Sequence, residues 1–166
     1  MSLQSYFDAI LAMQRARETT MRIGEALEQL EDLPKDANIK ISMEWVTPYQ
    51  EYYDTFNDKE YAEKRKHEYD NVQMYFDGTF GSDRGDYANM YLGYKEEPTT
   101  FTVQNLIDLL KTAKAEKTME GYKGGTFLIN DETLLTIAYY SFSEGIRPTS
   151  FELVGDEVIM HTTYKE

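Results

Sequence analysis

An acidic, tyrosine-rich segment, residues 44–97, holds the side chains best suited to binding. It contains nine of the 14 tyrosines, with thirteen acidic and six basic residues, a local balance of −7. Tyrosine offers rigid contact area with a polar tip, and clustered carboxylates attract a basic partner. The segment therefore predicts a surface that docks a basic protein, formed by Tyr49, Glu51, Tyr52, Tyr53, Asp54, Asp58 and Tyr61.

Two other interpretations of this segment stay open. Its spaced negative charge also imitates a nucleic acid, and such a surface blocks a protein that binds one. The second interpretation is structural, because tyrosine is a favoured strand residue and acidic, solvated faces are common. Exposed rings at Tyr49, Tyr52, Tyr53 and Tyr61 favour a binding role, whereas burial of these rings contradicts it.

The glycine-rich residues 77–86 include three carboxylates, those of Asp77, Asp83 and Asp86, as a calcium site does. Their spacing departs from the EF-hand pattern, because Thr79 and Gly81 stand where oxygen ligands are needed and no glutamate follows at position twelve. The chain has no cysteine, which excludes disulfides and thiolate metal sites. We therefore predict no metal and no cofactor, and this loop is the remaining metal candidate.

His161 and Arg147 are the candidate residues for an enzymatic function. His161 alternates with Met160 and Thr162 in a predicted strand, and it is the one neutral-pH base of the C-terminal half. A pocket near His161 and Arg147 would suit a small hydrolase or a ligand-binding enzyme. However, the sequence has no GxSxG, P-loop, GxGxxG or HExxH motif. A non-catalytic function is therefore the preferred interpretation.

Length, composition and charge limit the class of protein. A chain of 166 residues with 41% apolar residues is long and apolar enough to form one core, so we expect a single domain. The net charge of −13 disfavours direct binding to nucleic acids and anionic membranes. No apolar run reaches the roughly 18 residues of a membrane span, and no signal peptide is visible. We therefore expect a cytoplasmic protein.

Residues 4–31 predict one long amphipathic helix. It ends before Pro34, because proline disfavours helical geometry in the preceding residue. We expect this helix to pack on its own sheet, and the alternative is pairing with a second subunit, so the protein is a monomer or a homodimer through this helix. The predicted contact positions recur every three or four residues: Tyr6, Ala9, Met13, Ala16, Thr20, Ile23, Leu27 and Leu30.

The body of the domain, residues 38–164, alternates between strand and helix patterns. Thr102 caps a second amphipathic helix that runs to about residue 118, before Gly121 and Gly124. A shorter helix is expected at 58–69. The expected strands are 38–46, a hairpin of 72–76 with 87–94, a hairpin of 126–130 with 133–140, and, after a loop at 143–148, a hairpin of 151–154 with 157–162.

Together these elements predict an α+β fold. We expect a mostly antiparallel sheet of about six or seven strands, with the long N-terminal helix and the second helix packed on it. The expected function is a small, acidic, non-catalytic binding or regulatory protein that engages a basic protein partner, in the style of an accessory or mobile-element protein. The alternatives are the small enzyme with His161 and Arg147, and a structural or assembly subunit.

Overall fold

The computed structural model describes residues 2–7, 20–44, 70–82, 89–121, 124–139 and 142–164. Residues 3–7 are helical. The remaining elements follow in this order: α2 (Ile23–Glu31), β1 (Asn38–Glu44), β2 (Asp70–Ser82), β3 (Asn89–Lys95), α5 (Val103–Glu116), β4 (Thr118–Glu120), β5 (Thr126–Leu128), β6 (Leu134–Tyr139), β7 (Phe142–Val154) and β8 (Glu157–Tyr164).

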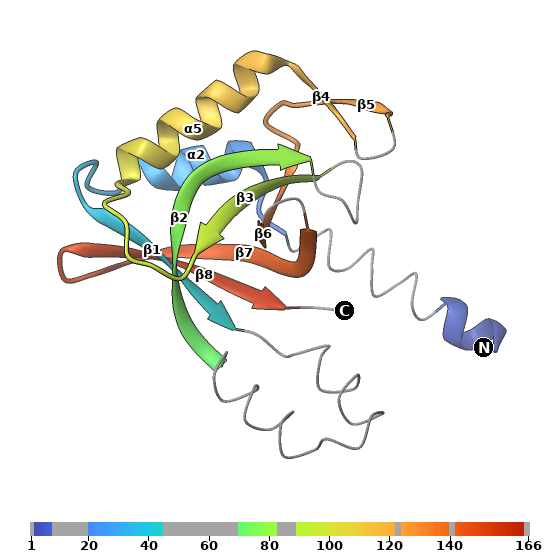
Figure 1. The fold of residues 1–166 in the computed structure, drawn as a ribbon, viewed down its shortest axis with the longest axis horizontal. Coiled ribbons are helices and arrows are strands. Elements are labelled where there is room, and N and C mark those ends of the chain that lie inside the picture. The colour runs from blue at the N-terminus through green and yellow to red at the C-terminus, as the bar shows by residue number, and fades with distance from the viewer. Residues whose placement is uncertain are drawn as a thin grey trace.

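Six of the strands close into a barrel in the order β1-β2-β3-β6-β7-β8, and β4 and β5 form a separate two-stranded sheet. The pairs β1–β8 and β3–β6 are parallel, and the other four barrel pairs are antiparallel. Figure 1 shows α2 and α5 together on one side of these strands. The predicted α+β class is confirmed, but the sheet is mixed and closed.

Apolar side chains fill the inside of the barrel. Alternate residues of a strand point to opposite faces of a sheet, and in β1, β2 and β8 buried residues alternate with more exposed ones. This confirms the pattern predicted for β1, where Lys40 and Ser42 lie on the outer face. The inner positions are at most 2% exposed at Ile39, Ile41, Met43, Met74, Phe76, Met90, Leu92, Leu135, Ile137, Ile146, Val158 and Met160.

Helix α5 forms as its local sequence predicts. The Thr102 hydroxyl accepts a hydrogen bond from the backbone N–H of Asn105, and the Asn105 side chain accepts one from the backbone N–H of Thr102. This reciprocal capping satisfies two N–H groups that the helix itself leaves free. The helix ends at Glu116, earlier than the predicted glycine stop, because Lys117 adopts a positive φ of 64°.

The predicted continuous helix over 4–31 is wrong. Residues 20–22 are not helical, and Arg22 is extended with φ −97° and ψ 160°. The N–H of Met21 donates to the carbonyl of Pro148, and the Met21 carbonyl accepts from the N–H of Leu135. Strand-like pairing with the barrel therefore replaces helical hydrogen bonds here. Among the described helices the longest is α5, in the middle of the chain, rather than an N-terminal helix.

The C-terminal strands pair differently from the prediction in two places. The segment at 126–128 pairs with β4 instead of with the strand that follows it. The expected loop at 143–148 belongs to β7. The hairpin of β7 and β8 is confirmed, with Gly155 at φ 65° in its turn.

The predicted hairpin of 72–76 with 87–94 is confirmed by the antiparallel pair β2–β3. Its register shifts at residues 77–79, because Phe76 pairs with Tyr94 while Phe80 pairs with Leu92. The helix expected at 58–69 lies outside the described residues. In the part of the chain that the structure describes, no helix is long and apolar enough to cross a membrane.

Candidate functional site

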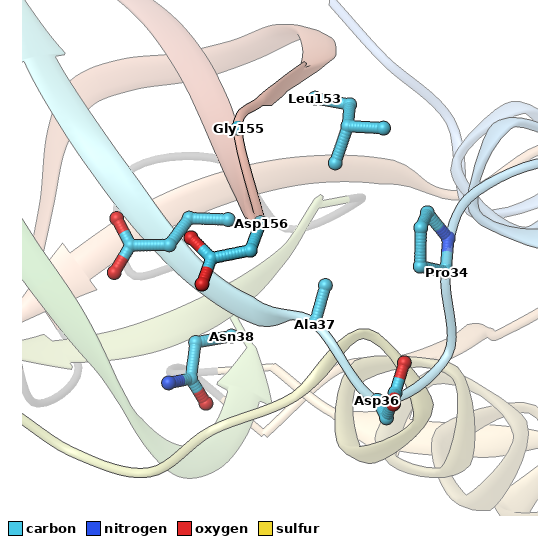
Figure 2. A pocket seen from close by; sticks show the side chains of 8 residues that line it. Pro34, Asp36, Ala37, Asn38, Leu153, Gly155 and Asp156 are labelled. Atoms are coloured by element: carbon cyan, nitrogen blue, oxygen red, sulfur yellow. The ribbon is translucent and has the colours of Figure 1, made fainter.

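A pocket of about 410 Å³ opens between the α2–β1 connection and the β7–β8 turn. Figure 2 shows Pro34 and Asp36 on the side of the connection, with Leu153 and Asp156 facing them from the hairpin. The residues that line it are Pro34, Asp36, Ala37, Asn38, Leu153, Gly155, Asp156 and Glu157.

The parallel pair β1–β8 brings these two segments together. Asn38 pairs with Glu157 where both strands begin, so the turn before β8 lies beside the connection that leads into β1. The connection is also fixed from the other side, because the N–H of Val103 donates to the carbonyl of Ala37 at 3.0 Å. The pocket wall is therefore held by the barrel and by the start of α5.

Lys35 is the basic residue of the connection, and its ammonium group binds backbone carbonyls at the C-terminal end of α2. Its Nζ donates to the carbonyls of Leu30 at 3.2 Å, Glu31 at 2.5 Å and Leu33 at 2.9 Å. These carbonyls belong to the C-terminal turn of α2 and the residues after it, where a cation is favourable. Lys35 does not line the pocket, whereas its neighbour Asp36 does.

The carboxylates of the pocket differ in how they are partnered. Glu157 binds Nζ of Lys40 at 2.7 Å. This hydrogen bond raises the pKa of Lys40, against the opposing effect of burial, and the charges of Glu157 and Asp156 add to the rise. Among the described residues, no base lies within ion-pair distance of Asp36 or Asp156. The pocket is therefore left with negative charge.

The hairpin tip adds exposed apolar surface. Leu153 and Val154 are each 46% exposed. Because consecutive strand residues point to opposite faces, exposure of both means that the tip extends past the body of the barrel. Leu153 lines the pocket together with Pro34 and Ala37, whereas Val154 does not.

His161 and Arg147 belong to different environments. Nε2 of His161 lies 2.8 Å from a carboxylate oxygen of Glu152 on the outside of the barrel. Arg147 donates through Nη1 to the Thr20 hydroxyl at 3.1 Å, which ties β7 to the residues before α2. Neither residue lines the described pocket. The catalytic assignment of this pair stays a prediction without geometric support.

Most of the predicted binding and metal residues lie outside the described part of the chain. This holds for Asp83 and Asp86. Asp77 lies in the irregular part of β2 and accepts hydrogen bonds from the N–H and hydroxyl of Thr79, at 2.8 and 2.6 Å. Within the described residues, no group of three or more acidic or histidine side chains is arranged to hold a metal. The predicted binding residues outside the description are Tyr49, Glu51, Tyr52, Tyr53, Asp54, Asp58 and Tyr61.

Sequence reasoning missed the pocket residues Asp36, Leu153 and Asp156. The local signals were present, since Pro34 marks a helix end and Gly155-Asp156 marks a hairpin turn. Only the pairing of Asn38 with Glu157 makes these segments neighbours, and no local pattern encodes that pairing. No protein-family model, curated protein or solved structure matches the chain.

Proposed function

We propose that the protein is a small, non-catalytic binding protein that engages a basic protein partner through its acidic outer surface. The observation that supports this most is the filled barrel. Its inner positions are apolar and almost fully buried, as in small barrels that are packed cores. The partner therefore binds outside, where the acidic residues lie.

The distribution of ion pairs supports an acidic binding surface. Four described bases pair with acids of the same chain, as Arg22–Glu25 (3.8 Å), Lys35–Glu31 (4.0 Å), Lys40–Glu157 (2.7 Å) and Lys114–Asp131 (2.6 Å). The described residues offer no base within ion-pair distance of the exposed Glu28, Asp32, Glu116 and Glu120. These four carboxylates are thus available to attract a cationic partner.

The tyrosine-rich residues 49–61 are the proposed anchors of this interface. Large aromatic side chains supply much of the binding energy at protein interfaces, while surrounding charges mainly set the association rate. Tyr52 and Tyr53 then govern how long the complex lasts. Glu51, Asp54 and Asp58 govern how fast it forms.

The test starts with affinity capture of the partner, followed by stopped-flow kinetics with the purified pair. The association rate should fall steeply as salt rises past about 0.15 M, where the Debye length is near 8 Å. A triple variant with Glu51→Gln, Asp54→Asn and Asp58→Asn should associate more slowly at low salt and melt at an unchanged temperature. Its charge-matched control carries Glu28→Gln, Glu116→Gln and Glu120→Gln.

Two results would contradict the proposal. One is an association rate that does not depend on salt. The other is a triple variant that associates as fast as the wild type at low salt, which would make the charge a solubility feature only. An equal loss in the control variant would mean that net charge, rather than residues 49–61, steers the partner.

A further inference from the structure

We infer that the pocket between the α2–β1 connection and the β7–β8 turn seats one basic side chain, an arginine or a lysine, of the protein partner. This inference rests on the proposed function and names the place where one partner residue binds. The pocket volume of about 410 Å³ falls in the range of small-ligand sites. It is large enough for one long side chain and too small for a helix or a folded domain.

The pocket lining fits both ends of such a side chain. Pro34, Ala37 and Leu153 give an apolar wall, and lysine and arginine bury their aliphatic stems on such surfaces while the charged head stays near water. Asp36 and Asp156 offer carboxylate oxygens to that head from opposite segments of the chain (Figure 2). Hydrogen bonds between two charged groups are shorter and stronger than neutral ones.

The charges around the pocket favour a cationic occupant. The nearby bases are already used, because Lys35 binds the carbonyls at the end of α2 and Lys40 binds Glu157. Asp36 and Asp156 form no ion pair with a described base. An anionic ligand would be repelled by them, and a purely apolar ligand would leave them desolvated without a partner.

Leu153 offers an apolar contact to the partner residue that neighbours the basic one. It is 46% exposed at the rim of the pocket, so an apolar residue next to the partner's basic residue gains contact there. Val154 is the matched control, because it is equally exposed on the same tip but does not line the pocket. A partner that uses the pocket covers Leu153 and leaves Val154 in solvent.

The first experiment is an NMR titration of the full chain with blocked dipeptides. Arginyl-leucine and lysyl-leucine should shift the backbone amides of residues 35–38 and 153–157, whereas neutral citrullyl-leucine should not. Shifts confined to other acidic segments, or equal shifts with citrullyl-leucine, would overturn the inference. The double variant Asp36→Asn with Asp156→Asn should weaken arginyl-leucine binding by about three- to tenfold, as loss of two partly exposed charge contacts does.

The control pair Asp108→Asn with Glu132→Gln removes the same charge at exposed positions outside the pocket and should leave the affinity for arginyl-leucine unchanged. With the captured partner, Leu153→Ser should raise the off-rate more than Val154→Ser does. If partner binding depends on salt but is not weakened by the Asp36 and Asp156 double variant, the inference about the pocket is wrong and the proposed function still stands. Salt-independent partner binding together with pocket shifts by arginyl-leucine refutes the proposed function alone.

Discussion

Arg22 forms an antiparallel β-bridge with Leu134, the first residue of β6, immediately before α2 begins. The other helix begins in the same way: Thr102, immediately before α5, forms an antiparallel bridge with Asn38, the first residue of β1. Each helix therefore begins where a strand from the other half of the chain begins. This arrangement locks the two halves to each other.

Each half of the chain supplies one helix and three barrel strands in the same order, α2-β1-β2-β3 in the first half and α5-β6-β7-β8 in the second. The first barrel strand of each half pairs in parallel with the last barrel strand of the other, as β1–β8 and β3–β6. The second half differs by the β4–β5 sheet between its helix and its first barrel strand. Neither half can close a barrel alone, so packing of the core depends on both.

The first prediction concerns Gly24, at the contact between α2 and the residues before β6. A methyl group at Gly24 would lie 2.8 Å from Cβ of Asp131 and 3.1 Å from its carbonyl oxygen. The N–H of Gly24 donates to that carbonyl at 2.9 Å, so the groups cannot separate without losing the hydrogen bond. Overpacking lowers the free energy of unfolding by about 1–3 kcal/mol. Alanine is more favourable than glycine in a helix by about 1 kcal/mol, which offsets part of that loss.

Gly24→Ala should therefore lower the free energy of unfolding by up to about 2 kcal/mol, measured by urea denaturation. Gly125→Ala is the control, because nothing lies within 4 Å of a methyl group there. A stabilised Gly24→Ala variant would mean that α2 does not contact Asp131 as described.

Elements whose determinants are local could be predicted from the sequence. The cap at Thr102 and the buried face of α5 lie within one segment, as do the alternation of β1 and the turn at Gly155. The failures lie where distant segments decide the outcome. Residues 20–22 continue a helical periodicity, but hydrogen bonds from Met21 to β6 and β7 outweigh the local preference.

In the candidate site, too, local features could be predicted from the sequence and features that depend on distant segments could not. The acidic and aromatic composition of residues 44–97 is visible in the sequence. The pocket is not, because Asp36 and Asp156 become neighbours only through the parallel pairing of β1 with β8. A parallel pair needs a long connection, so no turn signal marks it in the sequence.

The second prediction concerns the pH dependence of the Lys40–Glu157 ion pair. The pKa of Lys40 is raised above its ordinary value of 10.5, chiefly by the hydrogen bond from Nζ to Glu157. A raised lysine pKa means that the folded state holds the proton more tightly than the unfolded state does. The stability from this pair is thus fully present below about pH 10.5 and is lost as the pH rises through the raised pKa.

Glu157→Gln should lower the free energy of unfolding at pH 7 by at most about 1 kcal/mol, since the pair is partly exposed. The difference from the wild type should shrink above pH 10.5 and in high salt. NMR titration of the Lys40 Cε resonance checks the cause, because its midpoint should fall in the variant. A midpoint that does not move would contradict the assigned pair.

The third prediction concerns Asn89, the first residue of β3. Its side chain is fully buried, and the described residues offer no hydrogen-bond partner to its amide nitrogen or its amide oxygen. A buried polar group without a partner costs about 1–3 kcal/mol. Asn89→Leu replaces it by an apolar side chain of similar branching and should raise the free energy of unfolding by about 1 kcal/mol.

Asn38→Leu is the comparison for Asn89→Leu, because Asn38 begins β1 but is exposed. It should change stability by less than about 0.5 kcal/mol in the same urea denaturation. A destabilised Asn89→Leu variant with a normal Asn38→Leu variant would show that the Asn89 amide is hydrogen-bonded in the native state.

The fourth prediction concerns Lys117, which ends α5 with φ 64° and ψ −34°. A left-handed backbone costs an ordinary L-residue about 1–2 kcal/mol. The chain holds it there because the N–H of Lys117 donates to Lys114 and its carbonyl accepts from Ile129 at 2.9 Å. Both are backbone hydrogen bonds, so they survive a change of side chain.

Lys117→Gly should therefore raise the free energy of unfolding by about 0.5–1 kcal/mol, the relieved strain less the extra entropy of glycine in the unfolded chain. Lys111→Gly removes the same charge from the exposed middle of α5 and should lower it by about 1 kcal/mol. Thermal and urea unfolding of both variants should thus give shifts of opposite sign. Equal losses would show that Lys117 is not left-handed and that α5 ends elsewhere.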